Sequence, residues 1–135
     1  MARSRALGSQ CGAAYTVKTQ ARVLSGKAKV KFAGELTTLH SEYAGVPKTW
    51  VHVVFQDYAP GSGFTAGEAA ATATLTFLSR TGRSPEYKRE LVKRLWKLFQ
   101  DATGAPDDQI VLGIQGLPAS QAMEMGHVMP DLAEQ

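Results

Sequence analysis

Two arginines stand three residues apart in the segment "LSRTGRSPEYKRE", residues 78–90, between an apolar run and a predicted helix. Ser84 is a favoured N-cap residue and Pro85 a favoured first helical residue, so the helix is expected to begin there. A helix N-terminus gathers backbone N–H groups and the positive end of the helix dipole, which favours anions. Arg80 and Arg83 would add fork-shaped donors suited to a carboxylate. From the residues alone, two solvated loop arginines are the simpler interpretation, and an anion site is the alternative.

Two other side chains have the chemistry for proton transfer. His40 follows Leu39 and is expected at the edge of the apolar face of a predicted helix, where a structural role and a catalytic role both stay open. Glu124 lies among methionines in "QAMEMGHVMP", and apolar surroundings raise the pKa of a carboxyl group toward the range of a general acid or base. A surface glutamate is the alternative interpretation. The histidines, His52 and His127 included, lack the helical or hairpin spacing of metal ligands, so no metal site is expected.

The neighbours of these residues carry less chemistry. The methionines around Glu124 are expected to fill gaps in the packing; they are Met123, Met125 and Met129. Gly61-Ser62-Gly63 precedes no helix, so it does not form a phosphate cradle and no cofactor is expected.

Length and composition bound the class of protein. A chain of 135 residues with 44% hydrophobic content predicts one folded globular domain. The net charge of +3 is spread along the chain, without a basic run or interleaved aromatics, so nucleic acid is not an expected partner. Cys11 is the only cysteine, which excludes a disulfide framework and fits a reducing, cytoplasmic setting. No apolar run approaches the roughly 18 residues of a membrane span, and residues 1–12 are expected to form a flexible extension.

Periodicity predicts the order strand, helix, strand, loop, and then strand, helix, strand. The predicted strands cover 14–20, 49–55, 71–78 and 109–116, and the predicted helices run from Ser25 to Gly45 and from Ser84 to Gly104, with a loop over 56–69, a short helical turn after Pro118 and a loose end from Pro130. Two β-α-β units of similar size predict an α+β, or α/β, sandwich with both helices on one face of a mostly parallel sheet. The halves share no visible sequence repeat, so any symmetry is in shape only.

The segments "LTTLHSEYAG", "WVHVVFQD", "SRTGRSPEYKRELVKRL" and "GLPASQAMEMGHVMP" resemble the cis-chloroacrylic acid dehalogenase group of the tautomerase superfamily. The resemblance covers roughly residues 13–130. It implies that Arg80 and Arg83 bind a substrate carboxylate, that His40 assists, and that Glu124 activates water. It also implies a homotrimer with sites near the subunit boundaries.

Two positions depart from the family pattern. The family's principal catalyst is an amino-terminal proline, and the matching residue is Ala13, whose nitrogen is an amide because other residues precede it. The tyrosine of the penultimate strand aligns with Gly113. The resemblance therefore implies a single tautomerase-like domain over 13–135 in which proline-dependent tautomerase and dehalogenase activities are weak or absent.

Three hypotheses about function follow. The first is a cytoplasmic homotrimer that binds a small unsaturated or 2-oxo carboxylate and catalyses its hydration, decarboxylation or isomerisation with His40 and Glu124. The second is a catalytically inactive ligand-binding or scaffold protein with the same fold. The third is an RNA or DNA binder that uses the outer face of the second helix, and the modest charge makes it the weakest. That face carries Lys88, Arg89, Lys93, Arg94 and Lys97.

Overall fold

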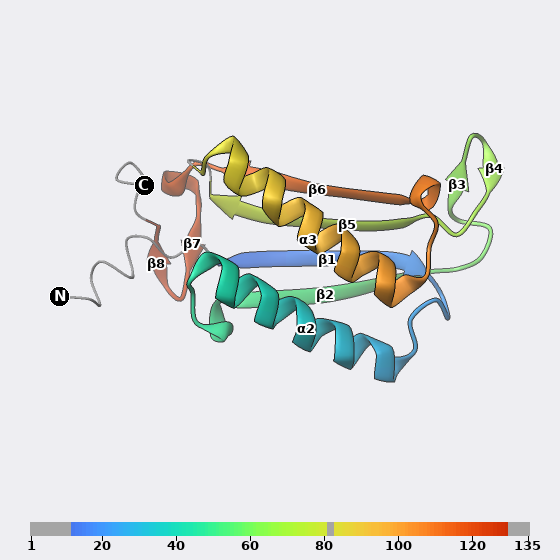
Figure 1. Ribbon diagram of the computed structural model, residues 1–135, viewed down its shortest axis with the longest axis horizontal. Coiled ribbons are helices and arrows are strands. Elements are labelled where there is room, and N and C mark those ends of the chain that lie inside the picture. The colour runs from blue at the N-terminus through green and yellow to red at the C-terminus, as the bar shows by residue number, and fades with distance from the viewer. Residues whose placement is uncertain (1–11, 81–82, 130–135) are drawn as a thin grey trace.

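Two α-helices cover one face of a four-stranded β-sheet (Figure 1). The computed structural model describes residues 12–80 and 83–129. The sheet consists of β1 (Ala13–Gln20), β2 (Val51–Tyr58), β5 (Ala73–Arg80) and β6 (Ile110–Leu117), and the helices are α2 (Gly26–Ala44) and α3 (Pro85–Thr103). The strand order is β2-β1-β5-β6; β1 and β5 are antiparallel, and the two outer pairings are parallel. This confirms the predicted sandwich of two β-α-β units.

Both helices begin and end at the residues that the sequence indicates. Ser25 and Ser84 are the N-caps, and each hydroxyl accepts a hydrogen bond from the backbone N–H three residues later, at 3.0 and 3.1 Å. Gly45 and Gly104 are the C-caps, with left-handed φ angles of 72° and 69°. Glycine adopts this conformation without a steric penalty, so it ends each helix at a defined position.

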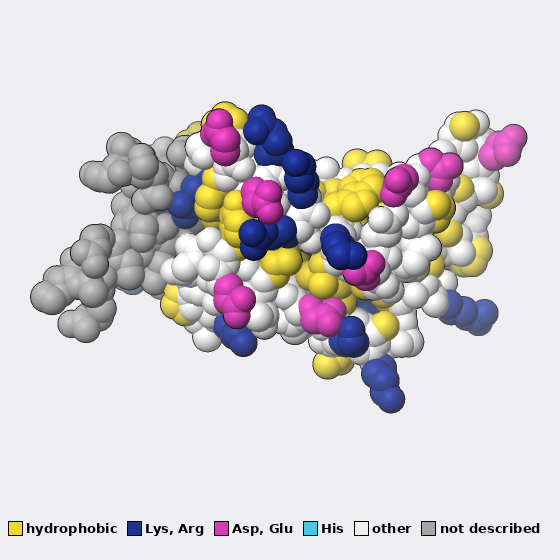
Figure 2. Space-filling model, viewed as in Figure 1, with side chains coloured by type: hydrophobic (Ala, Val, Ile, Leu, Met, Phe, Trp, Pro, Cys, Tyr) yellow, Lys and Arg dark blue, Asp and Glu magenta, His cyan; other side chains and the backbone are white. Residues whose placement is uncertain are grey.

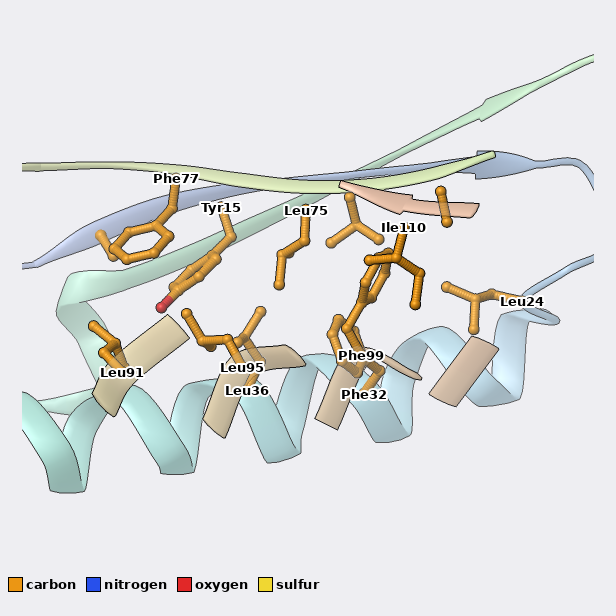
Figure 3. Packing of buried hydrophobic residues seen from close by; sticks show 13 residues of the cluster. Tyr15, Leu24, Phe32, Leu36, Leu75, Phe77, Leu91, Leu95, Phe99 and Ile110 are labelled. Atoms are coloured by element: carbon orange, nitrogen blue, oxygen red, sulfur yellow. The ribbon is translucent and has the colours of Figure 1, made fainter. Parts of the chain in front are cut away.

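The core lies between the sheet and the helices (Figure 3). In the close-up, Tyr15, Leu75 and Phe77 point from the strands toward the helices. The buried side chains of each helix follow a spacing of four residues: Phe32, Leu36 and His40 in α2, and Leu91, Leu95 and Phe99 in α3. Burying one large apolar side chain contributes about 1.5–3 kcal/mol, so this layer fixes how the helices sit on the sheet. It also includes His40, which corrects its expected place at the edge of the apolar face.

The region predicted as a loop, 56–69, contains the end of β2 and a small hairpin. Its strands are β3 (Phe64–Thr65) and β4 (Glu68–Ala69), joined by Ala66 and Gly67 in left-handed conformations. A second hairpin follows β6, with strands β7 (Met123–Glu124) and β8 (His127–Val128). Strands of two residues are too short to show a periodicity in sequence, so neither hairpin was predicted.

The two halves of the chain match in length, element by element. Each half has eight-residue strands, a 19-residue helix and a terminal hairpin. The C-cap glycines stand at 45 and 104 and the hairpin glycines at 67 and 126, so a spacing of 59 residues separates both pairs. The symmetry is therefore one of shape, as predicted.

The helix side of the molecule carries charges of both signs, interspersed over α2 and α3 (Figure 2). On α3, Arg94 pairs with Glu90 at 2.9 Å and Lys97 pairs with Asp101 at 3.4 Å. Exposed pairs one helical turn apart add only about 0.3–0.5 kcal/mol each, but they neutralise the positive field that a nucleic acid would need. This favours a solvated face over a nucleic-acid surface.

Two further sequence predictions concern the ends of the chain. The expected extension over 1–12 lies, apart from Gly12, outside the described residues, and so does the expected loose end from Pro130. In the part of the chain that the structure describes, no helix is long and apolar enough to cross a membrane.

Candidate active site

A cavity of about 410 Å³ lies at one end of the sheet, where β1 begins and β5 ends. The β7–β8 hairpin lies at this end of the molecule (Figure 1). The lining includes Ala13, Ala14, His52, Arg80, Leu117, Met123 and Glu124. The volume falls within the range of about 300–1,000 Å³ that is typical of small-ligand sites.

The matching position at the opposite end of the sheet is filled. The Tyr58 hydroxyl donates hydrogen bonds to the backbone oxygens of Thr72, at 2.5 Å, and Ala70, at 3.5 Å. The ring lies so close to Gly63 that a Cβ there would sit 2.6 Å from it. Leu117, 59 residues after Tyr58, has a shorter side chain and lines the cavity instead. The symmetry of the fold relates the two ends of the sheet, and the end where β1 begins has space for a ligand.

Arg80 reaches the cavity from the last position of β5 and is 2% exposed. Side chains alternate between the faces of a strand, so Arg80 and Leu78 point to the same side, opposite Phe77 in the core. The interpretation of Arg80 as a solvated loop residue is therefore wrong. A buried arginine presents its charge to a ligand with less screening than a surface arginine does.

Glu124 is held in the cavity by a tight turn. Met125 and Gly126 join β7 to β8 with φ angles of 53° and 82°, the left-handed geometry of a two-residue hairpin. The Glu124 side chain is half-buried, and burial raises the pKa of its carboxyl group, while the positive charges of Arg80 and His52 act in the opposite direction. Glu124 therefore lines a cavity and is only partly exposed.

Gly12 shows how closely Glu124 approaches the start of β1. A Cβ at Gly12 would overlap the Glu124 carboxylate and lie 2.7 Å from the backbone oxygen of Trp50. The clash with Trp50 involves backbone, which cannot move aside as a side chain can, so the close approach requires glycine. The carboxylate therefore lies directly beside the peptide that joins Gly12 to Ala13.

A second, smaller core packs against the base of the β7–β8 hairpin. It consists of Val46, Trp50, Ala119 and Met129. The Met129 N–H donates a 2.9 Å hydrogen bond to the Ala122 oxygen, which closes the base of the hairpin. Met129 fills the core as predicted, but Met123 and Met125 are 65% and 53% exposed, which corrects their expected role as packing residues.

Arg83 does not line the described part of the cavity. It precedes α3, and its guanidinium lies 4.7 Å from the centre of the Tyr87 ring, in cation–π geometry. The structure thus places Arg83 at the start of the helix, as the sequence indicates, and its role in carboxylate binding stays a prediction.

His40 is also absent from the described cavity lining. It is 1% exposed, and its Nδ1 atom shares a 2.8 Å hydrogen bond with the Tyr15 hydroxyl. Its ring also meets Tyr15 and Phe77 edge-on, at centroid distances of 5.5 and 6.0 Å. The structure brings together Arg80, Glu124 and Ala13, and it packs His40 among core rings on the helix side.

His52 is the cavity residue that the sequence interpretation missed. It was considered only as a metal ligand, and within the described residues no group of His, Cys, Asp or Glu side chains gathers as a metal site. Its place in the cavity follows from strand pairing, because β2 runs parallel to β1 with His52 opposite Ala14. That register depends on tertiary structure and leaves no local signal in the sequence.

Comparisons with known proteins agree on the family. Residues 13–135 match the protein family described as "Putative oxalocrotonate tautomerase enzyme". The native crystal structure of Ps01740 is 32% identical over 82% of this chain and 99% of its own, with a TM-score of 0.78. The crystal structure of N1, a member of the cis-3-chloroacrylic acid dehalogenase family, is 25% identical over 90% of this chain and 86% of its own, with a TM-score of 0.79. No curated protein matches the sequence.

This chain belongs to the tautomerase superfamily. It falls in the group that resembles cis-3-chloroacrylic acid dehalogenase. The symmetric trimer of fused 4-OT, at 21% identity over 85% of this chain and 94% of its own, shares the fold with a TM-score of 0.76.

The family match of this chain begins at Ala13, which is buried at the start of β1 and lines the cavity. Its nitrogen belongs to the peptide bond with Gly12 and so cannot take a proton near neutral pH. Gly113 lies in β6 opposite Thr76, and a Cβ added there would meet no described atom within 4 Å. The backbone therefore leaves room for a larger side chain where the family tyrosine is expected.

The raised pKa of Glu124 predicts a stability change that depends on pH. The native state binds the proton more tightly than the unfolded chain does, so Glu124 favours folding at low pH, and this contribution is lost as pH rises through the folded-state pKa. Glu124→Gln mimics the protonated form at every pH. Its melting temperature is expected to exceed that of the wild type at about pH 8 and to equal it at about pH 4. A difference in melting temperature that stays constant between these pH values would contradict the assignment.

Proposed function

We propose that this tautomerase-superfamily protein binds a small unsaturated or 2-oxo carboxylate and catalyses hydration or proton transfer on it. One observation carries the proposal: Arg80 and Glu124 line the same cavity, beside the buried start of β1. This combines a cationic group for an anionic substrate with a carboxyl group whose pKa is raised.

Arg80 is assigned to the substrate carboxylate. A guanidinium presents two parallel N–H donors to a carboxylate, and burial strengthens this interaction relative to water. Arg83, next to the N-terminus of α3, is proposed as the second carboxylate ligand, where the helix dipole adds to its charge.

Glu124 is assigned to proton transfer. A general base works best when its pKa approaches the working pH, and burial moves the pKa of Glu124 in that direction. His40 was the other candidate, but its Nδ1 atom is engaged with Tyr15 and it does not line the described cavity. The geometry therefore favours Glu124 as the group that touches the substrate or its water. His40 is assigned an indirect role, through its hydrogen bond with the Tyr15 hydroxyl.

Without an amine at Ala13, the proline-dependent tautomerase and dehalogenase activities of the group are proposed to be weak or absent.

The second candidate is a ligand-binding protein without catalysis. The observation that favours it is the packing of the Glu124 carboxylate against Gly12. Proton NMR of the protein with a panel of 2-oxo and acrylic acids separates the two. Turnover that Glu124→Gln abolishes supports the enzyme, and binding without turnover supports the second candidate. Neither binding nor turnover would contradict both.

The protein is also proposed to form a homotrimer through the uncovered face of the sheet. Fused 4-OT neighbours of the same fold are described as trimers. Opposite the helices, the sheet exposes Val54, Leu78 and Val111, with 56%, 40% and 62% of their surfaces accessible. These residues come from three strands, and exposed apolar side chains spread over an uncovered sheet face fit an association surface.

Val54→Lys is expected to convert the trimer to a monomer, because three copies of the charge would be buried without partners. Light scattering coupled to size exclusion measures the mass directly. Val30→Lys is the matched control, since Val30 lies on α2 and is 76% exposed, and it should leave the mass unchanged. A wild-type monomer, or a Val54→Lys variant with the mass of three chains, would contradict the proposed interface.

A further inference from the structure

The cavity needs a second proton-transfer group. Hydration of a carbon–carbon double bond takes one proton from water and delivers one proton to carbon. Glu124 can accept the first, but the nitrogen of Ala13 is an amide and cannot deliver the second. Another side chain that lines the same cavity can deliver it and leave Glu124 to act only as the base.

His52 is positioned for this task. It stands opposite Ala14 in the parallel pairing of β1 and β2, one position along from Ala13. It lines the cavity, and its side chain lies on the sheet face opposite the helices and is exposed. Histidine carries an ionisable nitrogen that exchanges protons near neutral pH, so its type suits the position.

Electrostatic coupling links His52 to the other two cavity residues. Positive charge on His52 lowers the pKa of the Glu124 carboxyl group, as does the charge of Arg80, so the three groups act within range of one another. No other described histidine has this relation to Glu124: His40 is buried against Tyr15, and His127 lies on β8 outside the described cavity lining.

We propose that His52 is a catalytic residue that donates a proton to the substrate carbon while Glu124 accepts a proton from the attacking water. This rests on the proposed function. The water O–H bond breaks toward Glu124, and the water oxygen bonds to C3 of the unsaturated acid. The electron pair of the double bond moves to C2 and takes the proton from a His52 nitrogen. Water is added across the double bond, and the proton on Glu124 returns to His52 through solvent, so the step needs no further reactant.

The test measures binding and turnover separately, with the unsaturated acid that the wild-type protein hydrates as the probe. His52→Gln is expected to lose about 100-fold or more in kcat while the dissociation constant of the acid stays within about threefold. His127→Gln is the matched control, three residues from Glu124, and should keep wild-type turnover. His52 shares the uncovered sheet face with Val54, so its glutamine variant is checked for assembly as well as folding. It is expected to keep the wild-type mass in light scattering and the wild-type melting temperature by circular dichroism.

The outcomes separate this inference from the function on which it rests. Turnover by His52→Gln within threefold of wild type, together with loss in Glu124→Gln, would overturn the role of His52 and leave the proposed function intact. Equal loss of binding and turnover in His52→Gln would make His52 a binding residue and would also overturn the inference. If the wild-type protein hydrates none of the acids, the inference fails. If it also catalyses no proton transfer on them, the proposed function fails in the wild type itself.

Discussion

Arg80→Ala is expected to weaken binding of a small carboxylate by about 100-fold or more, the largest effect of any single substitution in the site. Arg80 is 2% exposed and lines the cavity, so a ligand carboxylate would meet its guanidinium with little intervening water. Truncating one member of a buried charge pair costs about 2–5 kcal/mol, largely because the other charge is left without a partner. Isothermal titration calorimetry with a 2-oxo acid measures the change.

Two variants separate charge, geometry and folding in that experiment. Arg80→Lys keeps the positive charge but loses the paired donors, so its affinity should fall between those of wild type and Arg80→Ala. Arg89→Ala removes an exposed arginine from α3 and should leave binding unchanged. An Arg80→Ala variant that melts as a folded protein and binds the acid as tightly as wild type would show that the carboxylate lies elsewhere.

Restoring an amino-terminal proline is expected to create activity. The variant lacks residues 2–12 and carries Ala13→Pro, so removal of the initiator methionine exposes a secondary amine at the cavity. Proline is tolerated at the first residue of a strand, so β1 should still form. An amine beside Arg80 and Glu124 can both take and give a proton, and a positioned acid or base contributes about 100- to 10,000-fold in rate. Ketonisation of an enol acid, followed by its ultraviolet absorbance, should accelerate by at least the lower value.

The control for this gain is the same deletion with Ala13 retained, which exposes a primary amine on alanine. Its acceleration should be smaller, because the ring of proline fixes the direction of the nitrogen lone pair where alanine does not. Equal rates for the proline variant, the alanine control and the full-length protein would show that Ala13 does not stand where the catalytic amine acts.

The fold was predictable because its boundaries depend on local chemistry. Ser84, Pro85 and Gly104 each act within one helical turn, and the structure uses each of them where the sequence indicates. The apolar stripes of the helices likewise reflect a local period of 3.6 residues. Two similar β-α-β units then leave few arrangements other than one sheet with helices on one face.

The candidate site was less predictable because its geometry depends on long-range pairing. Periodicity placed the end of the third predicted strand at residue 78. In the structure, β5 continues to Arg80, because that residue pairs with Leu117 of β6. His40 was expected at a helix edge, but Tyr15 from β1 supplies a hydrogen-bond partner that makes its burial favourable. His52 gained its place only through the register of β2 against β1.

Residues of one type also received different environments. Met123, Met125 and Met129 have the same side chain within seven positions, yet Met129 is 3% exposed and the other two are more than half exposed. The β7–β8 hairpin explains the difference. Met123 and Met125 lie on the part of the hairpin that lines the cavity, whereas Met129 lies at its base and packs against Trp50. The apolar surroundings of Glu124 already indicated a candidate acid or base, and the resemblance to the dehalogenase group added the expected role in activating water.

The most direct test of the central claim is a crystal structure of the protein with a small 2-oxo acid bound. The account predicts electron density for the acid in the cavity beside Ala13, with its carboxylate within hydrogen-bonding distance of Arg80 and its reacting carbon facing Glu124. Density with the carboxylate turned away from Arg80, or an acid bound only outside this cavity at saturating concentration, would contradict it.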